Sequence, residues 1–221
     1  MNRLLAGASL LALLAANAAR AAEAAAAPAP SDATVEEVIV TGTRQVGVKA
    51  ADSAAPIEMV GSQQLLKTGA ADLAAALQSS VPSLNIQTNG GDAAAIQVLA
   101  ALRGLSPNDT LVLVDGKRRH TTSNLAVDGG SPYSGSATTD LSFIPVGAID
   151  HVEVLTDGAA AQYGTDAIAG VVNIILKKDS GGGTFTSTGG QYYNGQGSSL
   201  TISLSHGFNL NDKGFVDVTF E

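Results

Sequence analysis

The residues of this chain that could do chemistry are few, and their spacing does not suit catalysis. His120, His151 and His206 lie far apart in sequence and in unlike contexts, so ordinary polar positions explain them better than metal or catalytic roles. The chain has no cysteine. It also lacks a nucleophile elbow, a Walker A loop and a glycine-rich dinucleotide loop that opens a helix after a strand. The sequence therefore predicts no enzyme, no metal site and no cofactor.

The most prominent acidic and aromatic side chains fit structural roles. Asp115 and Asp157 each precede a glycine, which is typical of turns in which the aspartate bonds its own backbone. Arg103 and Glu153 are candidates for an ion pair inside the folded domain, where such a pair would be structural. Tyr163 is expected to be a packed ring with a bonded hydroxyl. These residues are therefore expected to hold the fold together.

The composition and charge of the chain bear on its size class and on the kind of partner it binds. The chain has 221 residues, of which 45% are hydrophobic and 4% aromatic, so there is room for one or two domains with a core. The net charge is −8. Nucleic acids are bound through lysines and arginines that neutralise phosphates, so this acidity argues against a nucleic-acid partner.

The first 21 residues have the pattern of a signal peptide. A positive start at Arg3 is followed by an apolar run over residues 4–16 and by small-residue cleavage patterns around Ala18 and Ala21. A membrane-spanning helix needs about 20 apolar residues, so this run is too short for an anchor. A buried N-terminal helix is the alternative. We expect residues 1–21 to be removed and the protein to be exported.

Residues 22–48 read as a linker followed by a strand-forming segment. The linker is rich in alanine and proline, whereas Val38, Ile39 and Val40 are consecutive β-branched residues closed by Gly42. A tethered, extended segment of this kind can add a strand to the sheet edge of another protein. It can equally be the first strand of the following domain, and the spacing alone leaves both interpretations open.

Residues 49–178 show a mixed α/β pattern. A helix is predicted over residues 68–81, with Thr68 as its N-cap, Pro82 after its end, and Leu73 and Leu77 packed against a sheet. That sheet is expected to include Thr110–Val114 and Ile149–Leu155. Further strands are predicted at residues 57–60, 84–87 and 171–176, and another is predicted to begin at residue 96. Turns are predicted at Asn89-Gly90-Gly91 and Asp115-Gly116, and a polar loop is predicted at residues 121–139.

Residues 179–221 alternate between apolar and polar side chains. Leu200, Ile202 and Leu204 alternate with serine and threonine, and residues 216–220 follow the same period of two. This pattern is typical of transmembrane β-strands, although any half-buried antiparallel sheet shares it. A barrel in lipid must close, and these residues supply too few strands, so we expect the chain to be a fragment or a truncated form.

Five motifs in order closely resemble those of TonB-dependent outer-membrane receptors: EEVIVTGTR, LRGL, TLVLVDGKR, IDHVEVLTDG and AIAGVVNIILKK. The resemblance implies an α+β plug domain over residues 49–178, a small mixed sheet with short helices, followed at 179–221 by the first antiparallel strands of an incomplete outer-membrane β-barrel. It departs from the family at Ala160, where serine is common, and at His151, where arginine is frequent. The second departure puts in doubt a charge contact between plug and barrel wall.

The resemblance also assigns roles to particular residues. It implies a TonB box, the segment that binds the energising TonB-type protein of the inner membrane, made of Glu37, Val38, Ile39, Val40, Thr41 and Gly42. It implies a structural motif of the plug made of Arg103, Gly104, Asp115, Gly116, Glu153, Asp157, Gly158, Tyr163, Gly164 and Gly170. Candidates for a ligand-facing loop are Ser123, Asn124, Asp128, Tyr133 and Ser134, with Tyr133 favoured for its flat ring and polar hydroxyl.

The implied function is energised uptake of a scarce nutrient across the outer membrane of a Gram-negative bacterium. Siderophores, cobalamin, haem and carbohydrates are the ligand classes that the resemblance leaves open. The alternative is a periplasmic plug module that transports nothing and only binds the TonB partner. The expected location is the outer membrane, although the chain alone could remain periplasmic.

Overall fold

The computed structural model describes residues 38–39, 41, 48–49, 55–68, 73–87, 97–123, 125–127, 133–191, 193 and 195–221. All of them belong to the compact unit Val38–Glu221. The predicted signal peptide, most of the linker and the turn at Asn89-Gly90-Gly91 lie outside the described residues, as do Glu37, Val40, Gly42, Asn124 and Asp128. No helix in the described part of the chain is both long and apolar enough to cross a bilayer.

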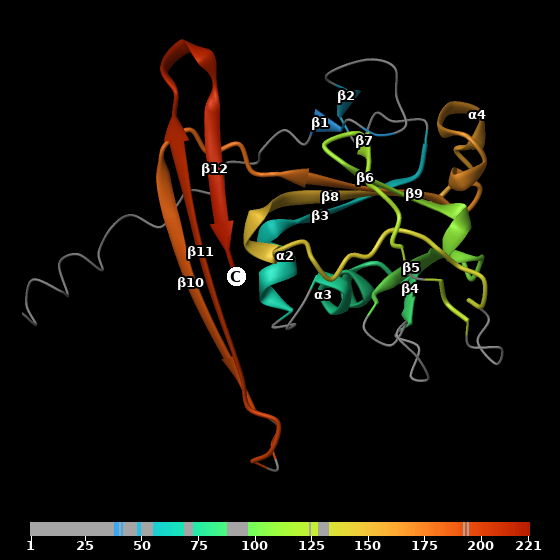
Figure 1. Ribbon diagram of the computed structural model, residues 1–221, viewed down its shortest axis with the longest axis horizontal. Helices are drawn as coiled ribbons and strands as arrows, with labels where there is room; N and C mark the ends of the chain where they lie inside the picture. The colour runs from blue at the N-terminus through green and yellow to red at the C-terminus, as the bar shows by residue number, and fades with distance from the viewer. Residues whose placement is uncertain are drawn as a thin grey trace, which may run out of the picture. The chain divides into compact units, whose positions relative to one another are not determined.

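A five-stranded mixed sheet organises most of this unit (Figure 1). Only β6 and β9 pair in parallel, and the other neighbours are antiparallel. The strands β6 and β9 are nearly continuous runs of valine, isoleucine and leucine, as expected for strands buried on both faces. In spatial order the strands are β3 (Ile57–Gly61), β8 (Ile149–Leu155), β9 (Gly170–Leu176), β6 (Thr110–Val114) and β7 (Lys117–Arg118).

Two short helices, α2 (Ser62–Lys67) and α3 (Leu73–Ser80), cover one face of this sheet (Figure 1). Leu73, Leu77 and Val81 are fully buried in one cluster with Val112 and Val152, which confirms the predicted packing. The predicted start of the helix is wrong. Thr68 is instead the C-cap of α2: its backbone is helical (φ −63°, ψ −22°), whereas an N-cap is extended, and its hydroxyl donates to the Leu65 carbonyl at 2.6 Å.

The opposite face carries a second, smaller core. Leu111, Leu155 and Val171 pack there with Ala159 and Ala167. Ala159 precedes the short helix α4 (Ala160–Tyr163), and Ala167 ends the 3-10 turn η5 (Thr165–Ala167). Figure 1 shows α4 on the far side of the sheet from α2 and α3. The two faces therefore bury different parts of the chain.

Two small strand pairs accompany the main sheet: one precedes it in sequence and one lies between β3 and β6. The first joins β1 (Val38–Ile39) to β2 (Val48–Lys49). The second joins β4 (Leu84–Gln87) to β5 (Leu99–Leu102), so β5 begins at Leu99 and not at residue 96. The Val98 amide bonds the Asp140 carboxylate at 3.1 Å. The 3-10 turns η3 (Pro107–Asp109) and η4 (Val146–Ala148) lead into β6 and β8.

An antiparallel three-stranded sheet follows, formed by β10 (Gly182–Gly190), β11 (Ser199–Asn209) and β12 (Phe215–Phe220), with η6 (Asn211–Lys213) in the last turn. One face is apolar and exposed: Leu200 is 69% and Phe220 73% exposed. The other face carries the buried residues Ser203 and Ser205. A mixed sheet with short helices followed by antiparallel strands is the predicted fold class, which is thereby confirmed.

Candidate functional site

Arg103 fixes the chain between β5 and β6. It has a positive φ of 56°, followed by Gly104 at 71°. Its Nε donates to the Ala169 carbonyl (3.0 Å) and its Nη2 to the Ile168 carbonyl (2.8 Å). The predicted ion pair between Arg103 and Glu153 is therefore wrong, because the guanidinium is used by backbone carbonyls just before β9.

The carboxylates of the two Asp-Gly turns accept hydrogen bonds from different partners. Asp115 (φ 49°) and Gly116 (φ 72°) form the tight turn between β6 and β7, as predicted, with both residues in the left-handed region. The Asp115 carboxylate accepts from the Leu176 amide (3.1 Å), so it ties the turn to β9 instead of to its own backbone. Asp157 does bond its own backbone, since its Oδ1 accepts from the Gly158 amide at 2.7 Å.

Two glycines stand where a side chain does not fit. Gly170 has a φ of 141°, and a Cβ there would overlap the Leu155 carbonyl oxygen. Gly164 has a φ of 94° at the end of α4. A positive φ favours glycine at both positions, and the close approach of the Leu155 carbonyl adds to this at Gly170. Tyr163 lies next to them, half-buried against the smaller core, and Ala160 is the first residue of α4.

A buried polar cluster lies on the face of the sheet that carries the smaller core. Glu153 of β8 and Asn173 of β9 are opposite each other in the register, and both are 0% exposed. Glu153 Oε2 accepts from the Thr41 amide (2.9 Å), from the Thr41 hydroxyl and from Asn173 Nδ2 (3.0 Å). Asn173 Nδ2 also donates to Thr41 Oγ1 at 2.8 Å. Thr41, which is 1% exposed, is thus bound inside the folded unit.

His151 adds a titratable group to this cluster. Its Nε2 lies 3.6 Å from Glu153 Oε1, and its Nδ1 lies 2.6 Å from Asp150 Oδ2. The Glu153 side chain raises the pKa of His151, and Asp150 adds to this effect, whereas burial opposes it. The sequence reasoning missed Asn173, although a single polar residue inside the apolar strand GVVNIIL was a signal that could have identified it.

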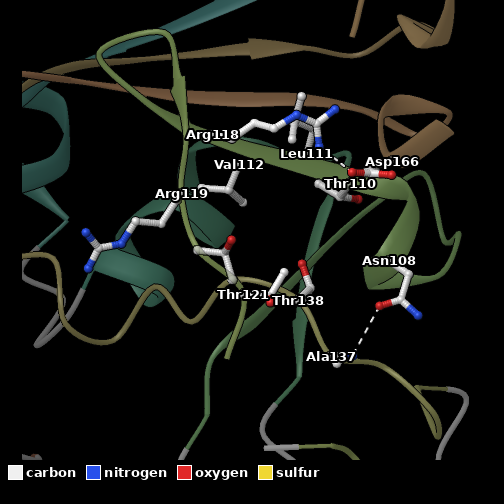
Figure 2. A pocket seen from close by; sticks show the side chains of 11 residues that line it. Asn108, Thr110, Leu111, Val112, Arg118, Arg119, Thr121, Ala137, Thr138 and Asp166 are labelled. Carbon is white, nitrogen blue, oxygen red and sulfur yellow. Dashed lines mark hydrogen bonds and ion pairs between the residues drawn. The ribbon is translucent and has the colours of Figure 1, made fainter. Parts of the chain in front are cut away.

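A cavity of about 290 Å³ with both polar and apolar lining residues lies beside β6 and β7 (Figure 2). Arg118 forms an ion pair with Asp166 and donates to the Tyr163 carbonyl. The Arg118 guanidinium lowers the pKa of Asp166. Arg119 extends away from this pair in Figure 2, and Thr121 and Thr138 line the side formed by the polar loop.

The candidate residues in the loop at residues 121–139 differ in their exposure. Ser123 and Ser134 are exposed. Tyr133, the favoured candidate for a ligand contact, is 5% exposed, and burial raises its pKa. A turn at residues 133–135 folds back on Ala126, whose carbonyl accepts from the Gly135 amide at 2.7 Å. A ligand-facing role for the exposed serines stays a prediction.

Known proteins share this architecture. The family model described as the TonB-dependent receptor plug domain matches residues 49–171. The ferrienterobactin receptor of Escherichia coli K12 is 44% identical over 80 residues, which are 36% of this chain and 10% of that protein. The vitamin B12 transporter BtuB of Vibrio vulnificus is 32% identical over 157 residues, which are 71% of this chain and 23% of that protein.

Solved structures agree with the fold. The ferric enterobactin receptor PfeA of Pseudomonas aeruginosa aligns with a TM-score of 0.56 at 23% identity, over 76% of this chain and 24% of that one. The siderophore receptor PirA of Acinetobacter baumannii aligns with a TM-score of 0.51 at 25% identity, over 74% of this chain and 23% of that one. The chain spans a quarter or less of the length of these proteins. Because the family model covers more than half of it, the chain belongs to the TonB-dependent receptor plug domain family.

Proposed function

We propose that this chain is the plug-bearing N-terminal part of a receptor that takes up a scarce nutrient across the outer membrane. The observation that carries the proposal is the family match over residues 49–171, directly followed by an antiparallel sheet with an exposed apolar face. The named relatives are receptors and transporters for ferric siderophores and vitamin B12. We infer a ligand of one of these classes.

The three strands β10 to β12 support a place in a membrane barrel. Phe185, Leu204 and Phe220 are aligned across the three strands, and all are more than half exposed. On the other face of β11, Ser203 and Ser205 are buried, and a Cβ on Gly147 of η4 would overlap the Ser203 hydroxyl. Lipid on the apolar face and the plug on the small-residue face account for this asymmetry. Residues 1–21 serve as the export signal in this proposal.

The energy source in this proposal is a TonB-type protein of the inner membrane. Glu37 to Gly42 form its binding segment, which adds a strand to the partner mainly through backbone hydrogen bonds. The pairing of β1 with β2 supports this, because Val38 and Ile39 already adopt the extended conformation that strand addition needs. Side-chain identity matters less in this mode than a free backbone donor.

Uptake by cells tests the proposal. The gene that encodes this chain, with its downstream reading frame, is expressed in a bacterium whose own siderophore and cobalamin receptors are deleted. Accumulation of an iron-55 siderophore or of labelled cobalamin is then measured with and without the tonB gene. We expect accumulation of at least one ligand that requires TonB. If TonB binds but no ligand accumulates, the non-transporting plug module becomes the better account.

A further inference from the structure

The carboxylate of Asp217 is buried without a hydrogen-bond donor. Both of its oxygens are shielded from solvent, and no described residue donates to either of them. A buried carboxylate is costly unless it is paired with a cation or hydrogen-bonded. In β12 the Asp217 side chain alternates with those of Val216 and Val218, which are exposed on the apolar face, so it lies on the face that looks toward the mixed sheet. A cationic partner is therefore expected on that side.

A cavity of about 370 Å³ brings two lysines to this carboxylate. Asp217 lines it together with Lys177 and Lys178, which directly follow β9. Neither lysine forms an ion pair within the described part of the chain. A lysine ammonium carries three donors on a flexible stem, so it can reach into the cavity. Asp115 lines the cavity too, but its carboxylate already accepts from the Leu176 amide, so Asp217 is the acid that lacks a donor.

The connection between the two sheets passes close to Asp217. Gly207 of β11 is the register partner of Asp217, and a Cβ at Gly207 would overlap the Asp179 carbonyl oxygen. The Lys177 amide donates to the Ala148 carbonyl at 2.9 Å. The connection at residues 177–181 is therefore held by η4 at its start and lies against β11 two residues later. This path places both lysines beside the buried carboxylate.

We propose that Asp217 pairs with the ammonium groups of Lys177 and Lys178, and that this ion pair is a latch between the antiparallel sheet β10–β12 and the end of the mixed sheet. The latch supplies the donors that the buried carboxylate lacks. It also fixes the connection at residues 177–181 from the side of β12, so that this stretch does not act as a free hinge. The two sheets then move as one body, whatever ligand the protein takes up.

The sign of one substitution tests the latch. Asp217→Asn keeps the shape of the side chain and removes its charge. If the carboxylate had no partner, D217N would raise the urea midpoint of the 221-residue chain, because a costly buried charge would be gone. With the latch we expect a lower midpoint, because the substitution breaks an ion pair. Asp179→Asn is the matched control, since Asp179 lies in the same connection but is exposed, and its midpoint should hardly change. A raised midpoint in D217N would overturn the proposal.

A double-mutant cycle tests whether the lysines are the partners. Replacing Lys177 and Lys178 together by glutamine leaves the buried carboxylate without a cation, so we expect the midpoint to fall. Adding Asp217→Asn to this background should raise the midpoint again, the opposite of its effect in the wild type. If D217N lowered the midpoint equally in both backgrounds, the lysines would not be its partners and the proposal would be overturned.

Hydrogen exchange places the effect at the junction. The Lys177 amide is bonded to the Ala148 carbonyl, so it exchanges when the connection lifts from η4. We expect this amide to exchange about tenfold faster in D217N than in the wild type, and at the wild-type rate in D179N. Equal exchange in D217N and wild type would show that Asp217 does not hold the connection, and would overturn the latch.

Discussion

Leu77→Ala tests whether the plug core is assembled as described. Leu77 is 0% exposed in the main core, where it packs with the sheet residues Val112 and Val152. The substitution removes three carbons, worth about 2.4 kcal/mol of transfer free energy at about 0.8 kcal/mol each. The cavity left behind adds roughly 1–2 kcal/mol. We therefore expect the free energy of unfolding to fall by about 3–5 kcal/mol.

The assay is urea unfolding of the 221-residue chain, followed by circular dichroism, with Leu66→Ala as the matched control. Leu66 lies in the neighbouring helix α2 but is 44% exposed, so the same chemical change there should cost less than about 1 kcal/mol. The variant L77A should shift the midpoint markedly and L66A only slightly. Equal shifts of the two midpoints would refute the packing of α3 on the sheet.

Three further predictions follow from the site. Gly170→Ala should lower the urea midpoint strongly, because its Cβ would overlap the Leu155 carbonyl, whereas Gly189→Ala, which has open space, should change it little; similar midpoints would contradict the close approach. His151 has a raised pKa, so its contribution to stability is complete below about pH 6.5 and is lost as the pH rises through the folded value. The urea midpoint should therefore fall as the pH rises above about 6.5, and His151→Gln should make the midpoint depend less on pH. If H151Q kept the wild-type dependence on pH, groups other than His151 would cause it. Arg103→Lys should lower the midpoint, because one ammonium cannot reach the Ala169 and Ile168 carbonyls as the guanidinium fork does; an unchanged midpoint would remove the role of these bonds.

Much of the fold was predictable because its strands carry strong local signals. Thr110–Val114 is an apolar run, and Ile149–Leu155 carries Ile149, Val152, Val154 and Leu155 between turns; both are strands. The start of the helix was not predictable from Thr68, since a threonine hydroxyl can accept from the amides ahead or donate to the carbonyl behind. Local pattern does not decide between these two bonds.

The site was less predictable because its contacts are distant in sequence. Glu153 was expected beside Arg103, yet it binds Thr41 and Asn173, and Arg103 bonds backbone carbonyls instead. An acidic residue in a buried strand indicates that its carboxylate must accept hydrogen bonds. The sequence does not indicate which of the chain's many donors supplies them. The burial of Tyr133, which is 5% exposed, was likewise not visible in the sequence, because it depends on how the loop folds.

Binding of a TonB periplasmic domain to Ile39 variants is the most direct test of the central claim, which is that an energising partner pairs with the backbone of this segment. Ile39 lies in β1 and pairs with Val48. Ile39→Pro removes one backbone donor and fixes φ, whereas Ile39→Val keeps both the donor and the β-branched shape. We predict that wild type and I39V bind with similar affinity, that I39P does not bind, and that I39P still folds, as shown by a cooperative urea transition. Equal affinity of I39P and wild type would contradict the claim.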